Sequence, residues 1–180
     1  GKFMQKLYKD TKKYYGLDLS NEQLKIAIEK IKNSNDNVEL FCCSAENIPL
    51  LDNQIDTIIS TWVLGTILDV DRRNKVLKEM KRVLKIGGKI YLVENDIGGQ
   101  FEQIRNRYPN IDKTKTYNEW IEGNGFKIAD KFETYFKFNN IEEAKKVFTN
   151  IWGDNIGANV DSNNIKHKIV IYEYFLESYL

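Results

Sequence analysis

The chain has 180 residues, of which 42% are hydrophobic and 29% charged, and its formal net charge at pH 7 is +1. Length and composition are those of one globular domain with a substantial core. The near-zero charge gives no electrostatic reason to expect nucleic acid or an acidic membrane as a partner. No apolar run approaches the roughly 20 residues that cross a bilayer, and no signal peptide is visible. We therefore expect a cytoplasmic protein without a membrane span.

The two cysteines, Cys42 and Cys43, are adjacent within an apolar run. Neighbouring residues of a strand point to opposite faces, which argues against a disulfide framework or a zinc site. Reduced cysteines are typical of intracellular proteins, and we expect no metal site.

Helices and strands alternate in the first half of the chain. Phe3/Leu7 and Met4/Tyr8 are pairs four residues apart and indicate a helix over Gly1–Thr11. Ser20 is a suitable N-cap, and Gln23, three residues on, completes a capping box. The further elements predicted here are strands at 14–18, 38–43 and 55–61 and a helix at about 21–32.

The second half continues the alternation and ends with two long strands. The pattern predicts a helix that is capped by Asp71, runs to about Leu84 and is stopped by Gly87 and Gly88. A helix containing Phe101, Ile104 and Tyr108 is closed by Pro109, and a capping box of Thr116 with Glu119 opens a short helix ended by Gly123 or Gly125. The remaining predicted elements are strands at 90–93, 127–138 and 166–175, a helix at 141–151 and a polar loop at 153–164.

Strands that alternate with helices of this length imply βαβ units, a parallel sheet and right-handed crossovers. The last two strands flank a short helix and a loop, so we expect them to pair antiparallel at an edge. There is no internal repeat and no linker, and we treat residues 1–180 as one domain.

Asp18 ends the first predicted strand, just before a helix. Ligands of open α/β sheets bind at the carboxyl ends of the strands, and a carboxylate there can accept both hydrogen bonds of a ribose diol. The alternative, that Asp18 is a solvated turn residue, is equally compatible with this stretch alone.

Four motifs in this order resemble the class I S-adenosylmethionine-dependent methyltransferases, specifically the small-molecule branch with a ubiquinone/menaquinone-methyltransferase-like core. They are Tyr-Gly-Leu-Asp-Leu-Ser (15–20), Ser-Ala-Glu-Asn-Ile-Pro-Leu (44–50), Asn-Gln-Ile-Asp-Thr-Ile-Ile-Ser (53–60) and Glu-Met-Lys-Arg-Val-Leu-Lys-Ile-Gly-Gly-Lys-Ile-Tyr-Leu-Val-Glu (79–94). The match runs from Gly1 to about Glu94 and continues in element order to Leu180.

The resemblance implies a Rossmann-like α/β fold. Its sheet has seven strands, is mostly parallel, ends in an antiparallel hairpin and lies in a three-layer αβα arrangement. Gly1 resembles the last glycine of the family's glycine-rich loop, so we expect that the first strand and most of that loop precede this sequence.

The resemblance also implies a binding site for S-adenosyl-L-methionine, formed by Gly1, Asp18, Leu19, Ser44, Ala45, Glu46, Thr61 and Trp62. In this interpretation Asp18 accepts from the ribose, Leu19 packs on adenine and Ala45 offers backbone hydrogen bonds to the adenine edge. Ser44 stands where the family often has Asp. Thr61 and Trp62 would contact the methionine part of the cofactor.

Methyl transfer is an in-line displacement at a sulfonium, so alignment of donor and acceptor matters more than a covalent residue. We identify no catalytic base. Gly65 replaces a histidine that is frequent in the family, and the only histidine, His167, is expected to be a surface residue at a strand edge. Glu94, Asn95 and Asp96 could face a substrate, but we favour a role in capping the next helix. The bulky aromatics Tyr108, Trp120 and Trp152 are more typical of a core than of a substrate pocket.

The function implied is methyl transfer from S-adenosyl-L-methionine to a small-molecule acceptor, with no nucleic acid as a partner. A catalytically degenerate methyltransferase-like domain that binds cofactor or a partner protein is the alternative, supported by Ser44 and Gly65. A dinucleotide oxidoreductase shares the acidic residue after its second strand, but the segments at 44–46 and 82–88 fit it less well.

Overall fold

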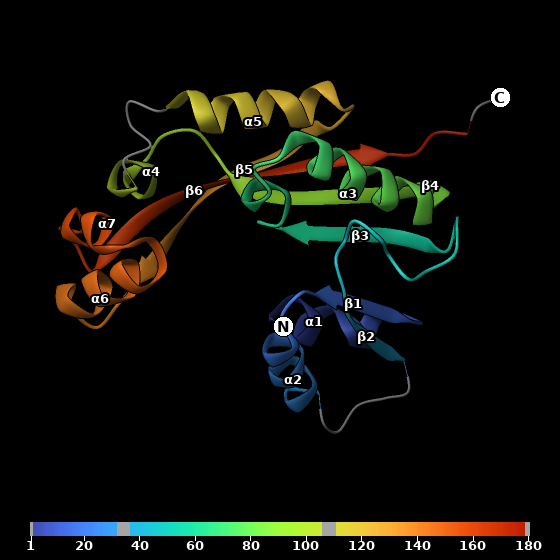
Figure 1. The fold of residues 1–180 in the computed structure, drawn as a ribbon, viewed down its shortest axis with the longest axis horizontal. Coiled ribbons are helices and arrows are strands. Elements are labelled where there is room, and N and C mark those ends of the chain that lie inside the picture. The colour runs from blue at the N-terminus through green and yellow to red at the C-terminus, as the bar shows by residue number, and fades with distance from the viewer. Residues whose placement is uncertain (1, 32–36, 106–110, 179–180) are drawn as a thin grey trace. The chain divides into compact units, whose positions relative to one another are not determined.

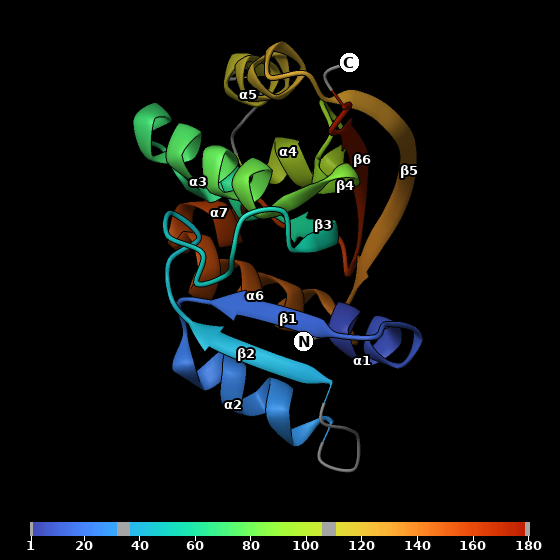
Figure 2. The same ribbon diagram turned by 90° about the vertical axis from the view of Figure 1, so that its right-hand side faces the viewer.

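The computed structural model describes residues 2–31, 37–105 and 111–178 (Figures 1 and 2). The chain forms two compact units. Unit 1 comprises Gly1–Ile55 and Leu68–Lys85, and unit 2 comprises Asp56–Ile67 and Ile86–Leu180.

Unit 1 contains a parallel β-α-β arrangement. Strand β1 (Tyr14–Asp18) pairs in parallel with β2 (Val38–Cys42), from Tyr14 opposite Val38 to Asp18 opposite Cys42. The two strands lie side by side in Figure 2, with α2 (Asn21–Glu29) next to them. The predicted parallel pairing of these two strands is confirmed.

A small apolar cluster connects the N-terminal helices of unit 1 to this sheet. Helix α1 (Lys2–Leu7) continues into the 3-10 helix η1 (Tyr8–Asp10). The buried members of the cluster are Met4, Tyr8 and Ala27, and the partly buried residues that pack against them are Tyr14, Ile31, Val38 and Leu40. The helix predicted over 21–32 ends at Glu29, and Lys32 lies outside the described residues.

Helix α3 (Val70–Val83) begins two residues earlier than expected. Asp69, not Asp71, is its N-cap, and the Asp69 carboxylate accepts a hydrogen bond from the Arg72 N–H at 2.9 Å. Gly87 and Gly88 do not stop this helix, because the chain passes from Val83 directly into β4. Gly87, at φ +79°, instead lies within that strand, where its N–H donates to the Leu176 carbonyl.

Unit 2 is built on a four-stranded sheet in the order β3-β4-β6-β5. The strands are β3 (Ile55–Thr61), β4 (Leu84–Asn95), β5 (Lys127–Lys137) and β6 (Asn164–Phe175). Both β4 and β5 pair antiparallel with β6, so the antiparallel pairing predicted for the last two strands is confirmed.

The helices of unit 2 are η2 (Leu64–Thr66), α4 (Gln100–Ile104), α5 (Ile111–Gly123), α6 (Ile141–Trp152) and α7 (Asp154–Ala158). Helices α4, α6 and α7 gather at one end of the long β5–β6 ladder (Figure 1). The core there contains Phe101, Ile104, Ala144, Phe148, Val160 and Ile165.

Two predictions for unit 2 are wrong. Thr116 lies inside α5 and does not cap it, and residues 154–158 form α7 where a polar loop was expected. Gly123 ends α5 as predicted, whereas Tyr108 and Pro109 lie outside the described residues.

The described residues form six strands in two sheets, of mixed direction. The α/β class is confirmed, but the strand count and the antiparallel pairs of unit 2 differ from a seven-stranded, mostly parallel sheet. Among these residues, no helix combines the length and the apolar character needed to cross a membrane.

Candidate functional site

Asp18 ends β1 and is exposed. Its Oδ1 accepts a hydrogen bond from the Ser20 N–H at 2.9 Å, and Ser20 Oγ in turn accepts from the Gln23 N–H at 3.2 Å and caps α2. In the predicted capping box the Gln23 side chain would accept from the Ser20 N–H. In the structure Asp18 accepts this hydrogen bond instead. A carboxylate offers about four acceptor positions, so Asp18 can still accept hydrogen bonds from a ligand.

The chain leaves β2 through a turn at Ser44–Asn47, where the Asn47 N–H donates to the Ser44 carbonyl at 3.1 Å. Ser44 Oγ accepts from the Glu46 N–H at 3.2 Å, which leaves its O–H able to donate. This turn lies beside Asp18, because the Cys43 N–H donates to the Asp18 carbonyl at 3.2 Å. Leu19, directly after Asp18, is 73% exposed. The structure therefore brings Asp18, Leu19 and the turn together at one edge of the β1–β2 sheet.

Glu46 has a structural partner within unit 1. Its Oε1 accepts hydrogen bonds from Arg72 Nε at 2.8 Å and Arg72 Nη2 at 2.6 Å. This ion pair joins the turn to the first residues of α3, and it raises the pKa of Arg72. The carboxylate predicted to bind cofactor is thus already engaged.

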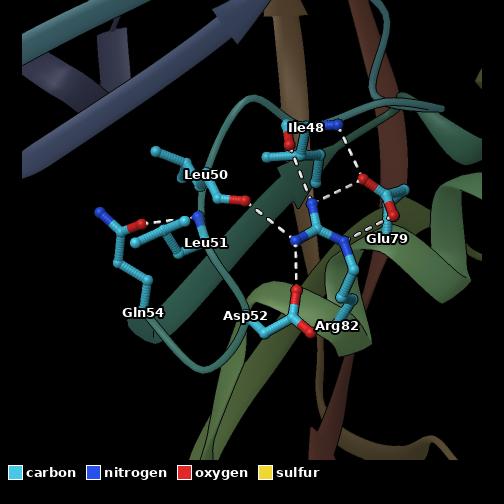
Figure 3. Close-up of polar contacts among 7 residues, drawn as sticks. All are labelled: Ile48, Leu50, Leu51, Asp52, Gln54, Glu79 and Arg82. Atoms are coloured by element: carbon cyan, nitrogen blue, oxygen red, sulfur yellow. Dashed lines mark hydrogen bonds and ion pairs between the residues drawn. The ribbon is translucent and has the colours of Figure 1, made fainter.

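Arg82 holds the rest of the loop after β2 in place (Figure 3). Its guanidinium donates to the carbonyls of Ile48 and Leu50, both at 2.9 Å, and to Asp52 Oδ1 at 2.7 Å. It also donates to both carboxylate oxygens of Glu79 at 2.7 and 2.8 Å. All donors of the planar guanidinium group face acceptors, which fixes the path of residues 48–52 against α3.

Thr61 and Trp62 lie at the exit of β3, in unit 2. Trp62 adopts a φ of +52°, a conformation that costs a non-glycine residue about 1–2 kcal/mol. Its N–H donates to the Val93 carbonyl and its Nε1–H to Asn95 Oδ1, both at 3.0 Å.

His167 is buried, with only 3% of its surface exposed, so the prediction of a surface residue at a strand edge is wrong. Strand β6 lies between β4 and β5, and His167 shares one face of it with buried Ile165 and Ile169, each two positions away. That alternation was a usable signal, because residues i and i+2 of a strand share a face. Burial, reinforced by the charge of Arg105, lowers the pKa of His167 to about 4.

Glu94 and Asn95, the last residues of β4, and Asp96 after them do not cap the next helix as we had favoured. Glu94 is 1% exposed and accepts a hydrogen bond from the Tyr117 hydroxyl at 2.8 Å, and the N-cap of α4 is Gly99. A Cβ on Gly65 would lie 3.1 Å from Glu94 Oε2, so the small residue at 65 makes room for this carboxylate. Asn95 contacts both Trp62 and His167.

Gly1, the remaining predicted site residue, lies outside the described residues. Within the described ranges there is no group of three or more His, Cys, Asp or Glu side chains that could hold a metal ion.

The model of the methyltransferase domain family matches residues 1–92 of this chain, which is more than half of its length. The chain belongs to the methyltransferase domain family. The resemblance to class I S-adenosylmethionine-dependent methyltransferases seen in the sequence is confirmed.

Among curated relatives of this family member, the demethylmenaquinone methyltransferase of Staphylococcus haemolyticus is 32% identical over 127 residues. The aligned region covers 64% of this chain and 52% of that protein, so the chain spans about half the length of this relative.

Solved structures agree in fold. The YcgJ protein from Bacillus subtilis superposes with a TM-score of 0.64 at 15% identity, over 96% of this chain and 86% of that one. The N-methyltransferase NodS from Bradyrhizobium japonicum, solved with S-adenosyl-L-homocysteine, gives a TM-score of 0.60 at 11% identity, over 96% and 72%. At these identities the similarity shows a Rossmann-like methyltransferase fold.

Proposed function

We propose that this chain binds S-adenosyl-L-methionine and transfers its methyl group to a small-molecule acceptor by in-line displacement. The observation that carries the proposal is the edge of unit 1 where Asp18 and the Ser44–Asn47 turn lie together with hydrogen-bonding capacity to spare. An adenosine needs a carboxylate for its ribose diol and polar groups for its base, and this edge offers both.

Each residue of this edge has a defined role in the proposal. Asp18 accepts from the ribose hydroxyls, and exposed Leu19 covers one face of the adenine. The Ser44 hydroxyl and the Ala45 N–H bond the adenine edge. A hydroxyl binds the exocyclic amine more weakly than a carboxylate would, so we expect modest cofactor affinity.

The small-molecule acceptor is suggested by the relatives that are named demethylmenaquinone methyltransferases. Because no base is evident, the chain's contribution to the reaction is alignment of donor and acceptor and exclusion of water.

Titration calorimetry with S-adenosyl-L-methionine on the full chain tests the binding step. We expect Asp18→Ala to weaken binding about thirtyfold, since it removes about 2 kcal/mol of hydrogen bonding to a charged group. Asp71→Ala removes a carboxylate exposed on α3 and serves as the matched control. Unchanged affinity in Asp18→Ala would refute the assignment of the site.

A turnover assay separates the enzyme from a domain that only binds. We expect S-adenosyl-L-homocysteine to accumulate when demethylmenaquinone, or another small hydroxyl- or amine-bearing acceptor, is supplied. Cofactor binding without turnover on any of these acceptors would favour the degenerate domain, and micromolar binding of a nicotinamide dinucleotide instead would favour the oxidoreductase.

We further propose that both units belong to one methyltransferase domain whose complete sheet has seven strands in a three-layer αβα arrangement. The six strands described and the family match support this.

A further inference from the structure

Strand β5 (Lys127–Lys137) is an open edge of the sheet of unit 2. In the order β3-β4-β6-β5 it pairs with β6 on one side, and no other strand of the described chain pairs with it (Figure 2). All of its residues except Thr134 and Phe136 are exposed. Such an edge presents a row of backbone N–H and C=O groups that can pair with another strand.

The exposed side chains of β5 include three large hydrophobic ones. Ile128, Phe132 and Tyr135 are 47%, 42% and 44% exposed. A groove of about 430 Å³ lies at the start of the strand. It is lined by Gly125, Lys127, Ile128, Ala129, Glu173, Phe175 and Glu177. An unpaired edge beside a partly apolar groove suits strand addition, in which backbone hydrogen bonds give affinity and pockets for side chains give specificity.

The sequence of β5 complements itself in one antiparallel register. A two-fold axis through Phe132 sets the two Phe132 side chains opposite each other. It also sets Lys131 of each copy opposite Glu133 of the partner subunit, so that two pairs of opposite charge flank the axis. Aromatic pairs and pairs of opposite charge that lie directly across an antiparallel ladder are stabilising.

Neighbouring registers of the same two strands are less favourable. Residues opposite each other in an antiparallel ladder are of the same hydrogen-bonding type, so a two-fold axis has to pass through a residue. Moving the axis by one residue sets Lys131 or Glu133 opposite its own copy, which is destabilising. With the axis at Phe132, the one pair of like charges is Lys127 with Lys137. That pair lies at the end of the strand, beyond the irregularity in the ladder at 128–130.

Ion pairs already present on β5 extend this match. Lys131 Nζ lies 3.0 Å from Asp96 Oδ1, and Lys166 Nζ lies 3.1 Å from Glu133 Oε2. The Lys131 and Glu133 side chains are 48% and 45% exposed, and each can bond a second group. On pairing, Asp96 and Lys131 would be followed by Glu133 and Lys166 of the partner subunit, in a row of alternating sign. Networks of this kind contribute more than isolated exposed ion pairs.

We propose that two copies of this chain associate through β5, antiparallel about a two-fold axis through Phe132, so that their unit 2 sheets join into one continuous sheet. In this register Tyr135 of the partner subunit lies opposite Ala129, beside the groove at the start of β5. The interface consists mainly of one pair of strands, so we expect a dimer that dissociates on dilution. The inference needs unit 2 alone and does not depend on the proposed function.

Sedimentation velocity on the full chain, from about 1 μM to about 300 μM, tests the association. We expect the dimer fraction to rise with concentration and the amide exchange of residues 130–134 to slow in parallel. A monomer throughout this range, with exchange independent of concentration, would overturn the proposal and leave the edge to a partner of another sequence.

Charge reversal tests the contacts across the axis. Lys131→Glu and Glu133→Lys each place like charges opposite each other on both sides of the axis, and we expect each to weaken association about thirtyfold or more. Lys115→Glu is the matched control, since it breaks an exposed ion pair with Glu119 on α5 and should leave association unchanged. Circular dichroism and thermal melting verify that the variants are folded. A dimer that neither reversal at β5 weakens would overturn this interface.

Mixing the two variants tests the register itself. When Lys131→Glu is combined with Glu133→Lys, each opposed pair of positions 131 and 133 again joins opposite charges. We therefore expect a heterodimer whose affinity is within about fivefold of that of the unchanged protein, although neither variant associates well alone. Failure of the mixture to associate more tightly than either folded variant would overturn the proposed pairing.

Discussion

The Arg82→Met substitution tests whether one guanidinium holds the loop that carries the proposed adenine site. Methionine keeps most of the apolar stem of the side chain and removes every donor. The two loop carbonyls, of Ile48 and Leu50, lose their charged partner, and Glu79 is left without the cation that now lowers its pKa.

The expected loss of folding stability in Arg82→Met follows from how exposed each partner of Arg82 is. The Asp52 side chain is 69% exposed, so its ion pair contributes less than about 1 kcal/mol. The hydrogen bonds to Ile48 and Leu50 are half-buried and charge-assisted, and we assign about 1 kcal/mol to each after allowing for replacement by water. Restoring water to Glu79, which is 17% exposed, offsets part of its loss. We expect a total destabilisation of about 2–3 kcal/mol.

Urea unfolding measures the total destabilisation, and hydrogen–deuterium exchange of residues 43–54 shows whether this loop is the part of the chain that is loosened. Arg72→Met is the matched control, since the Arg72 side chain is 57% exposed and its guanidinium bonds the Glu46 side chain, so its loss should cost less than about 1 kcal/mol. Arg82→Met should also weaken S-adenosyl-L-methionine binding by freeing the loop. Equal urea midpoints for the two variants, with no faster exchange in the loop, would refute the reasoning.

Two further predictions concern unit 2. Because the pKa of His167 falls from an ordinary 6.5 to about 4 on folding, the unfolded chain binds more protons between these values, and stability is lost as pH falls from 6.5 towards 4. The free energies of unfolding measured with urea at pH 7 and pH 5 should differ by about 1–2 kcal/mol more in the unchanged protein than in His167→Gln, and an equal difference would contradict the assignment. Gly65→Ala places a Cβ 3.1 Å from Glu94 Oε2 and should cost about 1 kcal/mol. Gly65→His, the residue frequent in the family, should cost about 1–3 kcal/mol because Tyr117 is also in the way. Thermal melting checks both, and an unchanged melting temperature in Gly65→His would show that the site has room.

Local chemistry made most of the elements of the fold predictable from the sequence. Ser20 caps α2 because a hydroxyl there reaches the Gln23 N–H, and that interaction needs only neighbouring residues. The apolar alternation of 166–175 likewise fixes a strand. The error at the start of α3 arose where two residues could serve as the N-cap. Asp69 and Asp71 are both carboxylates near the start of this helix, and in the structure Asp69 is the one that accepts from a helix N–H.

The surroundings of the exit of β3 were not predictable in the same way. His167 and Asn95 are separated by 72 positions in the chain and meet because β4 and β6 pair. No local pattern assigns such a partner, because the partner depends on the order of the strands in the sheet. The sequence indicated that β6 lies at an edge, whereas it is flanked by β4 and β5. The positive φ of Trp62 was hidden for the same reason, since the contacts that enforce it come from Val93 and Asn95 on another strand.

The polar groups of the proposed cofactor edge serve the fold and leave room for a ligand at the same time. Asp18 gives Oδ1 to the Ser20 N–H, and Ser44 Oγ accepts from the Glu46 N–H while its O–H stays able to donate. Removing either side chain therefore disturbs a turn as well as a binding group, and Asp18→Ala alone mixes the two effects. Asp18→Asn separates them: its amide oxygen can still accept from Ser20 and preserve the entry to α2, whereas the charge and one acceptor offered to a ribose are lost. Stability close to that of the unchanged protein together with weaker cofactor binding is the outcome that a ligand-binding carboxylate requires, and a loss of stability with unchanged binding would leave Asp18 a turn residue.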